Sequence, residues 1–245
     1  MRTGNPVLRE DTFSARHTAV GQATMTIGGT VNKTFLLTVL LLLSAGWVWS
    51  QTMTEGGLEQ TVPLIFGGAI AGLVLVLISV FKPAWSAVTA PLYALAEGLF
   101  VGGVSALLEL QFPGIVLQAV GLTVATLLAL LAAYRSGLIK VTQNFRLGVV
   151  AATGGIFLVY LASWILGMFG IDMPFLHDSG PLGIGISLVI VAVAALNLVL
   201  DFDFIEQGAE HGAPRYMEWF AALGLMVTLV WLYIEILRLL SKLRE

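Results

Sequence analysis

Long apolar stretches are the feature that most constrains what this chain can fold into. Seven of them follow one another along the sequence, separated by short polar joints. Their approximate bounds are 33–50, 63–81, 86–110, 114–134, 146–170, 181–203 and 216–243. Each stretch is close to the ~20 residues that an α-helix needs to cross a bilayer. The pattern predicts an all-α, polytopic membrane protein, built as a bundle of seven transmembrane helices.

Composition supports this fold class. Only 11% of the residues are charged, against roughly 25% in soluble domains. A transmembrane β-barrel would show shorter segments of alternating polarity, and the sequence has none. The net charge is -3 and the sequence has no basic stripe, so we do not expect it to bind nucleic acid. The apolar stretches lead us to expect the lipid bilayer as a partner. The absence of cysteine excludes disulfides and thiolate metal sites.

Prolines and glycines mark joints and helix contacts. Five prolines fall in or beside the joints, where helices begin or end: Pro63, Pro83, Pro113, Pro181 and Pro214. Pro91 is the exception, because it lies inside the third stretch. The spacings Gly68-x-x-x-Gly72 and Gly98-x-x-x-Gly102 predict close packing between helices of the same chain.

The basic residues suggest an orientation. Residues 1–30 are polar and rich in Gly and Thr, which predicts a flexible cytosolic tail ahead of a transmembrane domain at 31–245. With the N-terminus inside, the outer loops 51–62, 111–113 and 171–180 carry no Lys or Arg, as the positive-inside rule requires. Three basic residues depart from the rule, because an odd number of spans places them outside: Arg238, Lys242 and Arg244. A re-entrant last helix is the alternative, but the length of 216–243 favours a full span.

Three acids inside the apolar stretches are candidates for a role. Glu97 lies near the middle of the third stretch, so it must face the bundle interior, a partner or water. A pore or proton-linked acid and a structural hydrogen bond explain it equally well. Glu235 can pair with Arg238 three residues on, and this interpretation is favoured over a pore role. Glu218 lies in the first turn of the last helix, where the helix dipole is sufficient to explain it.

An acidic break separates the last two apolar stretches. On a helix, Asp201 and Asp203 point in nearly opposite directions, so they are not expected to form a pair. Asn197 shares a face with Asp201, and Gln207 shares one with Asp203. Asp203 is interpreted as a solvated acid at a helix end. Asp201 directly follows apolar residues, and a functional role is favoured for it.

Several classes of protein are disfavoured. The lysines lie at the ends of the stretches or in loops, so no buried lysine can hold a retinal Schiff base. His17, His177 and His211 are too far apart to converge on one metal. The sequence contains no H-E-x-x-H, G-x-S-x-G or P-loop pattern. We therefore expect neither an enzyme nor a cofactor or resident metal.

Three segments carry a resemblance to a known family. They are the junction LDFDFIEQGAEHGAPRYMEW, the following ALGLMVTLVWLYIEILRLL, and ALAEGLFVGG in the third stretch. From about residue 25 to residue 243 the chain resembles the Bax inhibitor-1 family, also called the transmembrane Bax inhibitor motif family, and within it a bacterial branch with short loops. The resemblance implies a seven-helix fold with the last helix central, placed in the bacterial inner membrane with a cytoplasmic N-terminus.

The resemblance also implies a pH-sensitive calcium leak, with calcium as the permeant ion. In that family two aspartates on the sixth and seventh helices share a proton and gate a cytosolic opening. Asp201 matches the first aspartate, but Thr228 stands where the second should fall, and a threonine cannot share a proton in that way. Asp203 or Glu97 could supply the second acid. The expected sensing residues are thus Asp201, Asp203 and Thr228, and the expected pore-lining residues are Glu97, Asn197 and Glu235.

Two other functions remain open. Some bacterial relatives are thought to restrain a membrane-anchored ATP-dependent protease, and the tail at 1–30 would be the contact. A proton-coupled transporter is supported by Glu97, Asp201 and the glycine-rich helices. It ranks last, because the third and sixth stretches are not clearly broken helices, as transporter sites require.

Overall fold

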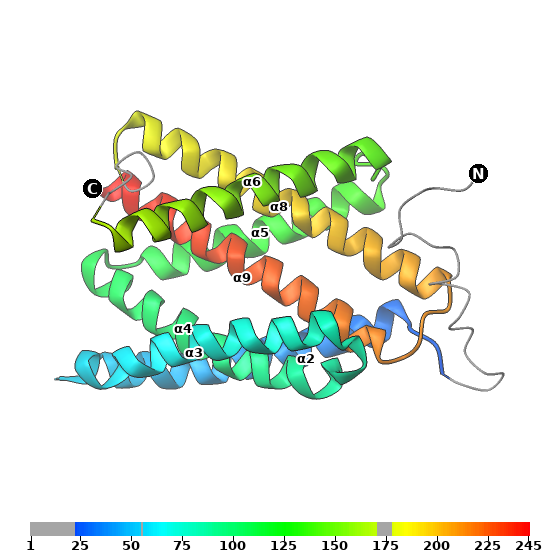
Figure 1. Cartoon of the computed structure of the whole chain (residues 1–245), viewed down its shortest axis with the longest axis horizontal. Coiled ribbons are helices and arrows are strands. Elements are labelled where there is room, and N and C mark those ends of the chain that lie inside the picture. The colour runs from blue at the N-terminus through cyan, green and yellow to red at the C-terminus, as the bar shows by residue number, and fades with distance from the viewer. Residues whose placement is uncertain (1–22, 55, 171–177) are drawn as a thin grey trace.

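The protein is described by a computed structural model that covers residues 23–54, 56–170 and 178–245. Seven long α-helices and one short 3-10 helix make up these residues, and they run side by side along one axis (Figure 1). The elements are α2 (Ile27–Thr52), α3 (Gly57–Phe81), η1 (Pro83–Trp85), α4 (Ser86–Gln111), α5 (Ile115–Arg135), α6 (Gln143–Met168), α8 (Pro181–Glu210) and α9 (Met217–Arg244).

The seven predicted spans are confirmed. Each long helix is apolar enough to cross a membrane, and their lengths reach from 21 residues in α5 to 30 in α8. The ends differ in two places. Helix α2 begins at Ile27, so residues 27–30, assigned from the sequence to a flexible tail, are helical. Residues 1–22 of that tail lie outside the described residues.

Helix α8 continues unbroken to Glu210, beyond the predicted end of the sixth span at residue 203. The reason is packing on one face of the helix. Phe202 and Ile205 are both buried at 8% exposure, which continues the apolar face of α8 past the first acids. The acidic residues occupy the other faces of the same helix. Asp201 and Asp203 are therefore fixed in direction by a regular helix and not by a loop.

The placement of Pro63 also differs from the prediction. It was expected at the start of a helix, but α3 begins at Gly57 and contains it. The hydroxyl of Thr61 donates to the Gly57 carbonyl at 2.9 Å in the turn before the proline. Hydroxyl side chains of this kind help membrane helices to tolerate proline. Pro91 lies inside α4, as expected.

The last helix is central, as the resemblance implied. Helix α9 packs against α2, α4, α5 and α8, and it crosses the middle of the bundle in orange and red (Figure 1). It is the most deeply buried of the spans, and it supplies much of the apolar core, including Ala222, Met226, Leu232, Ile236 and Leu237. Helix α9 therefore joins the α2 and α4 side of the bundle to the α5 and α8 side.

Glycines bring α2, α3 and α4 into close contact. A Cβ atom on Gly102 would lie 2.4 Å from the carbonyl oxygen of Ala45 in α2, and one on Gly68 would lie 2.5 Å from the carbonyl oxygen of Ala96 in α4. Only glycine allows backbones to approach so closely. The small-residue spacings thus form contacts within the chain, as predicted.

Candidate functional site

The candidate site lies where α8 meets α9. The Oδ2 atom of Asp201 is buried and has no hydrogen-bond partner among the residues that the structure describes. Thr228 of α9 is the side chain that interacts with the Asp201 carboxylate. The Thr228 hydroxyl itself donates to the Gly224 carbonyl at 3.2 Å. An acid and a hydroxyl thus face each other across the α8–α9 contact, at the two positions that the resemblance singled out.

Asp203 points to a different neighbour. Its Oδ2 atom accepts hydrogen bonds from Arg146 of α6 at 2.6 Å and from Gln207 at 2.7 Å. Only 13% of its side chain is exposed. Asp203 is therefore an ion-paired residue that joins α8 to α6, and the prediction of a solvated acid at a helix end is wrong. Its direction agrees with the expectation that it does not pair with Asp201.

No second acid accompanies Asp201 within the residues that the structure describes. Glu97 lies at the contact between α4 and α3, where a Cβ atom on Gly72 would be 2.5 Å from its Oε2 atom. Its neighbour on the same face is Tyr93. The small size of Gly72 makes the space that Glu97 occupies. The structure therefore does not bring Glu97 or Asp203 to the place of a second sensing carboxylate.

Asn197 and Glu235 are hydrogen-bonded to α6. The Asn197 amide donates to the Thr153 hydroxyl at 2.8 Å. Glu235 is only 2% exposed, and its carboxylate accepts bonds from Tyr160 at 3.0 and 3.1 Å. Arg238 donates to both of its oxygens at 3.2 Å, which is the ion pair that the spacing predicted. Both residues thus serve contacts between helices.

A cavity of about 860 Å³ is lined by α2, α4, α5, α8 and α9. It opens on the surface between α2 and α5, where Phe35 and Leu128 of its lining are exposed. Its polar lining includes three hydroxyls of α2, spaced four residues apart at Thr30, Thr34 and Thr38. Ser105 and Tyr233 line it as well, and their hydroxyls are 2.7 Å apart. These residues were missed from the sequence, although the four-residue spacing of the threonines was visible in it.

The candidate residues do not line this cavity together. Glu97, Asn197, Glu235 and Asp201 are all absent from its wall, while Phe202, the neighbour of Asp201, is part of it. The cavity carries Arg135 and Glu206 near its end beside the α8 terminus. Asp201 is thus one residue removed from the cavity and is connected to it through Phe202.

A second buried acid secures the same end of the bundle. Glu218 is 2% exposed, accepts bonds from the Thr26 amide at 3.0 Å and its hydroxyl at 2.9 Å, and forms an ion pair with Lys33. The Met25 amide also donates to the Ala213 carbonyl at 2.7 Å. Residues 24–26 are therefore fixed to the connection between α8 and α9. The helix dipole alone does not account for Glu218.

Fold and site together define an integral membrane protein of seven helices, with an acid between the last two whose Oδ2 atom is buried without a hydrogen-bond partner among the described residues. In the part of the chain that the structure describes, no group of His, Cys, Asp and Glu residues could hold a metal ion. The family model described as Bax inhibitor 1 like matches residues 5–245, and the chain belongs to this family. Comparisons with curated proteins and with solved structures give no match.

Proposed function

We propose that the protein is a pH-sensitive cation leak of the bacterial inner membrane, with calcium as the ion and Asp201 as the titrating group. The observation that carries the proposal is the Asp201 Oδ2 atom, which is buried without a partner and belongs to a carboxylate that faces Thr228. A polar group in that situation is costly unless its protonation state or its surroundings change. Such groups inside membrane helices mark functional sites by default.

The hydroxyl of Thr228 suits one protonation state of Asp201. Its hydrogen is used on the Gly224 carbonyl, so towards Asp201 it can offer an oxygen lone pair. A protonated Asp201 can donate to that oxygen and hold α8 against α9. An ionised Asp201 has no hydrogen to donate and places a charge in the contact, which favours separation of the helices and entry of water.

Movement of α8 would change the wall of the 860 Å³ cavity directly. Phe202 follows Asp201 on the helix and lines the cavity. The hydroxyl oxygens of α2 and the Glu206 carboxylate are hard oxygen ligands of the kind that calcium prefers. The proposed route therefore runs through this cavity, and Asp201 controls its inner end from the neighbouring helix contact.

The test is calcium flux into liposomes that contain the purified protein, measured from acidic to alkaline pH. We expect the flux of the wild type to rise with pH as Asp201 ionises. Asp201→Asn cannot ionise, so its flux should stay low and lose the pH dependence. Glu210→Gln is the matched control, because Glu210 is an exposed acid at the end of the same helix, and it should keep the wild-type response.

Two results would overturn the proposal. One is a flux from the wild type that equals the flux into empty liposomes at every pH. The other is an Asp201→Asn variant whose flux still rises with pH as the wild type does.

A second candidate is modulation of a membrane-anchored ATP-dependent protease through the N-terminal tail. The supporting observation is the fixed position of residues 24–26 on the connection between α8 and α9. A partner bound to the preceding tail would lie beside the Asp201 end of the bundle. Deletion of residues 1–20 should abolish co-purification with the protease, while Asp201→Asn should leave it intact. Equal recovery with and without the tail would count against this function.

A further inference from the structure

Helix α6 is attached to the bundle by polar side chains on a single face. Three of its residues, spaced seven apart, bind partners on α8 and α9. The pairs are Arg146 with Asp203 at 2.6 Å, Thr153 with Asn197 at 2.8 Å and Tyr160 with Glu235 at 3.0 Å. Seven residues make almost two helical turns, so the three lie in one row. Val149 is the one fully buried residue of α6.

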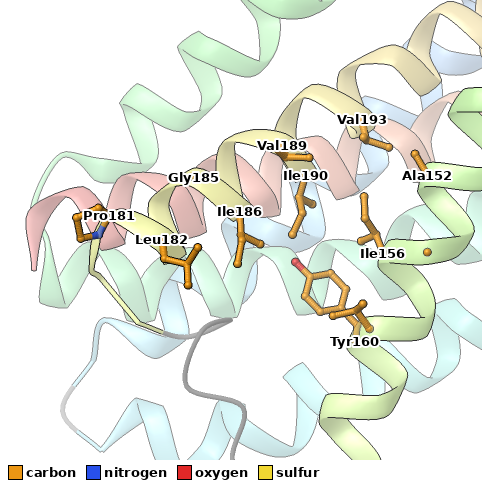
Figure 2. A pocket seen from close by; sticks show the side chains of 12 residues that line it. Ala152, Ile156, Tyr160, Pro181, Leu182, Gly185, Ile186, Val189, Ile190 and Val193 are labelled. Atoms are coloured by element: carbon orange, nitrogen blue, oxygen red, sulfur yellow. The ribbon is translucent and has the colours of Figure 1, made fainter.

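Between these polar pairs, α6 and α8 do not close on each other. A crevice of about 540 Å³ separates them, and side chains such as Ile156 of α6 and Ile186 and Val189 of α8 point into it (Figure 2). Gly155 and Gly185 lie on its two walls, and a Cβ atom on either would meet nothing within 4 Å.

These glycines behave differently from those of α4. Small residues in membrane helices usually allow close approach of two backbones, as Gly102 does against Ala45. At Gly155 and Gly185 the same small size leaves open space, because the polar pairs set the distance between the helices. The crevice therefore follows from how α6 is attached.

The side chains that line the crevice are almost entirely apolar. Its one side-chain polar group is the Tyr160 hydroxyl, and that hydroxyl is already bonded to Glu235. The crevice is continuous with the lipid-facing surface, where Leu182 is 67%, Val189 61% and Val159 42% exposed. Because these helices span the membrane, the medium at its mouth is acyl chains. An unfilled crevice would lose dispersion contacts on every wall.

We propose that the crevice between α6 and α8 is a binding site for one acyl chain of a bilayer phospholipid. The chain would lie between Gly155 and Gly185, with the ring of Tyr160 beside it. The three polar pairs would hold the two walls apart and so keep the site formed. Such a lipid would be retained longer than the lipids that merely surround the bundle.

The test fills the crevice without disturbing the fold. Gly155→Leu combined with Gly185→Leu places two side chains into open space. The matched control combines Gly121→Leu with Gly148→Leu, since both glycines are equally open but lie outside the crevice. After purification in mild detergent, native mass spectrometry should find one retained phospholipid on the wild type and the control. In the filled variant we expect retention to fall at least tenfold.

A measurement in liposomes covers the case in which the double variant folds poorly. A phospholipid with a photoactivatable group in the middle of its acyl chain should label Ile156 and Ile186 of the wild type. Gly155→Leu alone should suppress this labelling, while labelling of the exposed Phe157 should persist. Equal retention and equal labelling in wild type and filled variants would overturn the proposal.

A second copy of the chain is the competing occupant. The protein has no cysteine, so Val159→Cys introduces a single thiol at the rim of the crevice. We expect this variant to remain a monomer under oxidising conditions in liposomes. Efficient formation of a disulfide-linked dimer would show that another protein molecule covers the crevice, and would also overturn the proposal.

Discussion

Replacement of Glu218 tests whether its network or the helix dipole governs its contribution to stability. In the structure Glu218 is 2% exposed, accepts two hydrogen bonds from Thr26 and pairs with Lys33, whose side chain is 16% exposed. Glu218→Ala would leave Lys33 and the Thr26 amide without their acceptor. We therefore expect a large loss in the free energy of unfolding.

The two explanations differ in magnitude. Breaking a buried ion pair by removing one partner costs about 3–5 kcal/mol, whereas a carboxylate at a helix N-terminus contributes about 0.3–1 kcal/mol through the dipole. Because Lys33 keeps some exposure to solvent, we expect Glu218→Ala to lie near the lower end, at about 3 kcal/mol. Glu218→Gln should cost less, since its amide oxygen can still accept from Thr26.

The measurement is equilibrium unfolding in mixed micelles with increasing denaturing detergent. Glu59→Ala is the matched control, because Glu59 also lies in the first turn of a helix, α3, but is exposed. It should change the free energy of unfolding by less than about 1 kcal/mol. If Glu218→Ala costs no more than Glu59→Ala, the buried network contributes nothing and the reasoning is refuted.

Two further predictions concern helix contacts and use the same unfolding measurement. Gly102→Ala should lower the free energy of unfolding by about 1–3 kcal/mol, because its Cβ atom would overlap backbone atoms of Ala45. The control is Gly121→Ala, whose Cβ atom meets nothing within 4 Å, and it should change the free energy of unfolding by no more than about 0.5 kcal/mol. Equal losses in the two variants would contradict the close approach of the helices. In a double-mutant cycle, Tyr160→Phe and Glu235→Ala should show a coupling of about 0.6 kcal/mol and at most about 1.7 kcal/mol, the mean and maximum for hydrogen bonds between membrane helices. Additive effects would mean that the bond does not form.

The fold was largely predictable from the sequence, because in a membrane the apolar stretches themselves are the structural elements. Helix length and number follow from the thickness of the bilayer. What the sequence could not reveal is where a helix ends once it leaves the membrane. Helix α8 continues to Glu210 because Phe202 and Ile205 are buried against other helices, and no local pattern around the acidic residues shows those contacts.

The candidate site was predictable only in part. The direction of Asp201 relative to Asp203 follows from helical geometry, and the structure agrees. Asp203 forms an ion pair with Arg146 of α6, and Glu218 forms one with Lys33 of α2. Both partners lie far away in the sequence. Spacing arguments see only neighbours within about two turns, so ion pairs between distant helices were out of reach.

The basic residues at the C-terminus now have a structural explanation. Arg238 pairs with Glu235, Lys242 donates to the Gly183 carbonyl at 3.2 Å, and Arg244 donates to the Pro113 carbonyl at 2.9 Å. Each binds acceptors at the end of the bundle where α9 finishes. These bonds within the bundle account for the three basic side chains at the end of α9.

The ion pair between Lys33 and Glu218 joins residues that are 185 positions apart. A ribosome therefore delivers the lysine long before its partner exists. While α2 inserts, Lys33 carries an uncompensated charge of the kind that sets the orientation of an early helix. When α9 arrives, the Glu218 carboxylate compensates that charge, and the Lys33 side chain becomes part of a bond that joins the first described helix to the last.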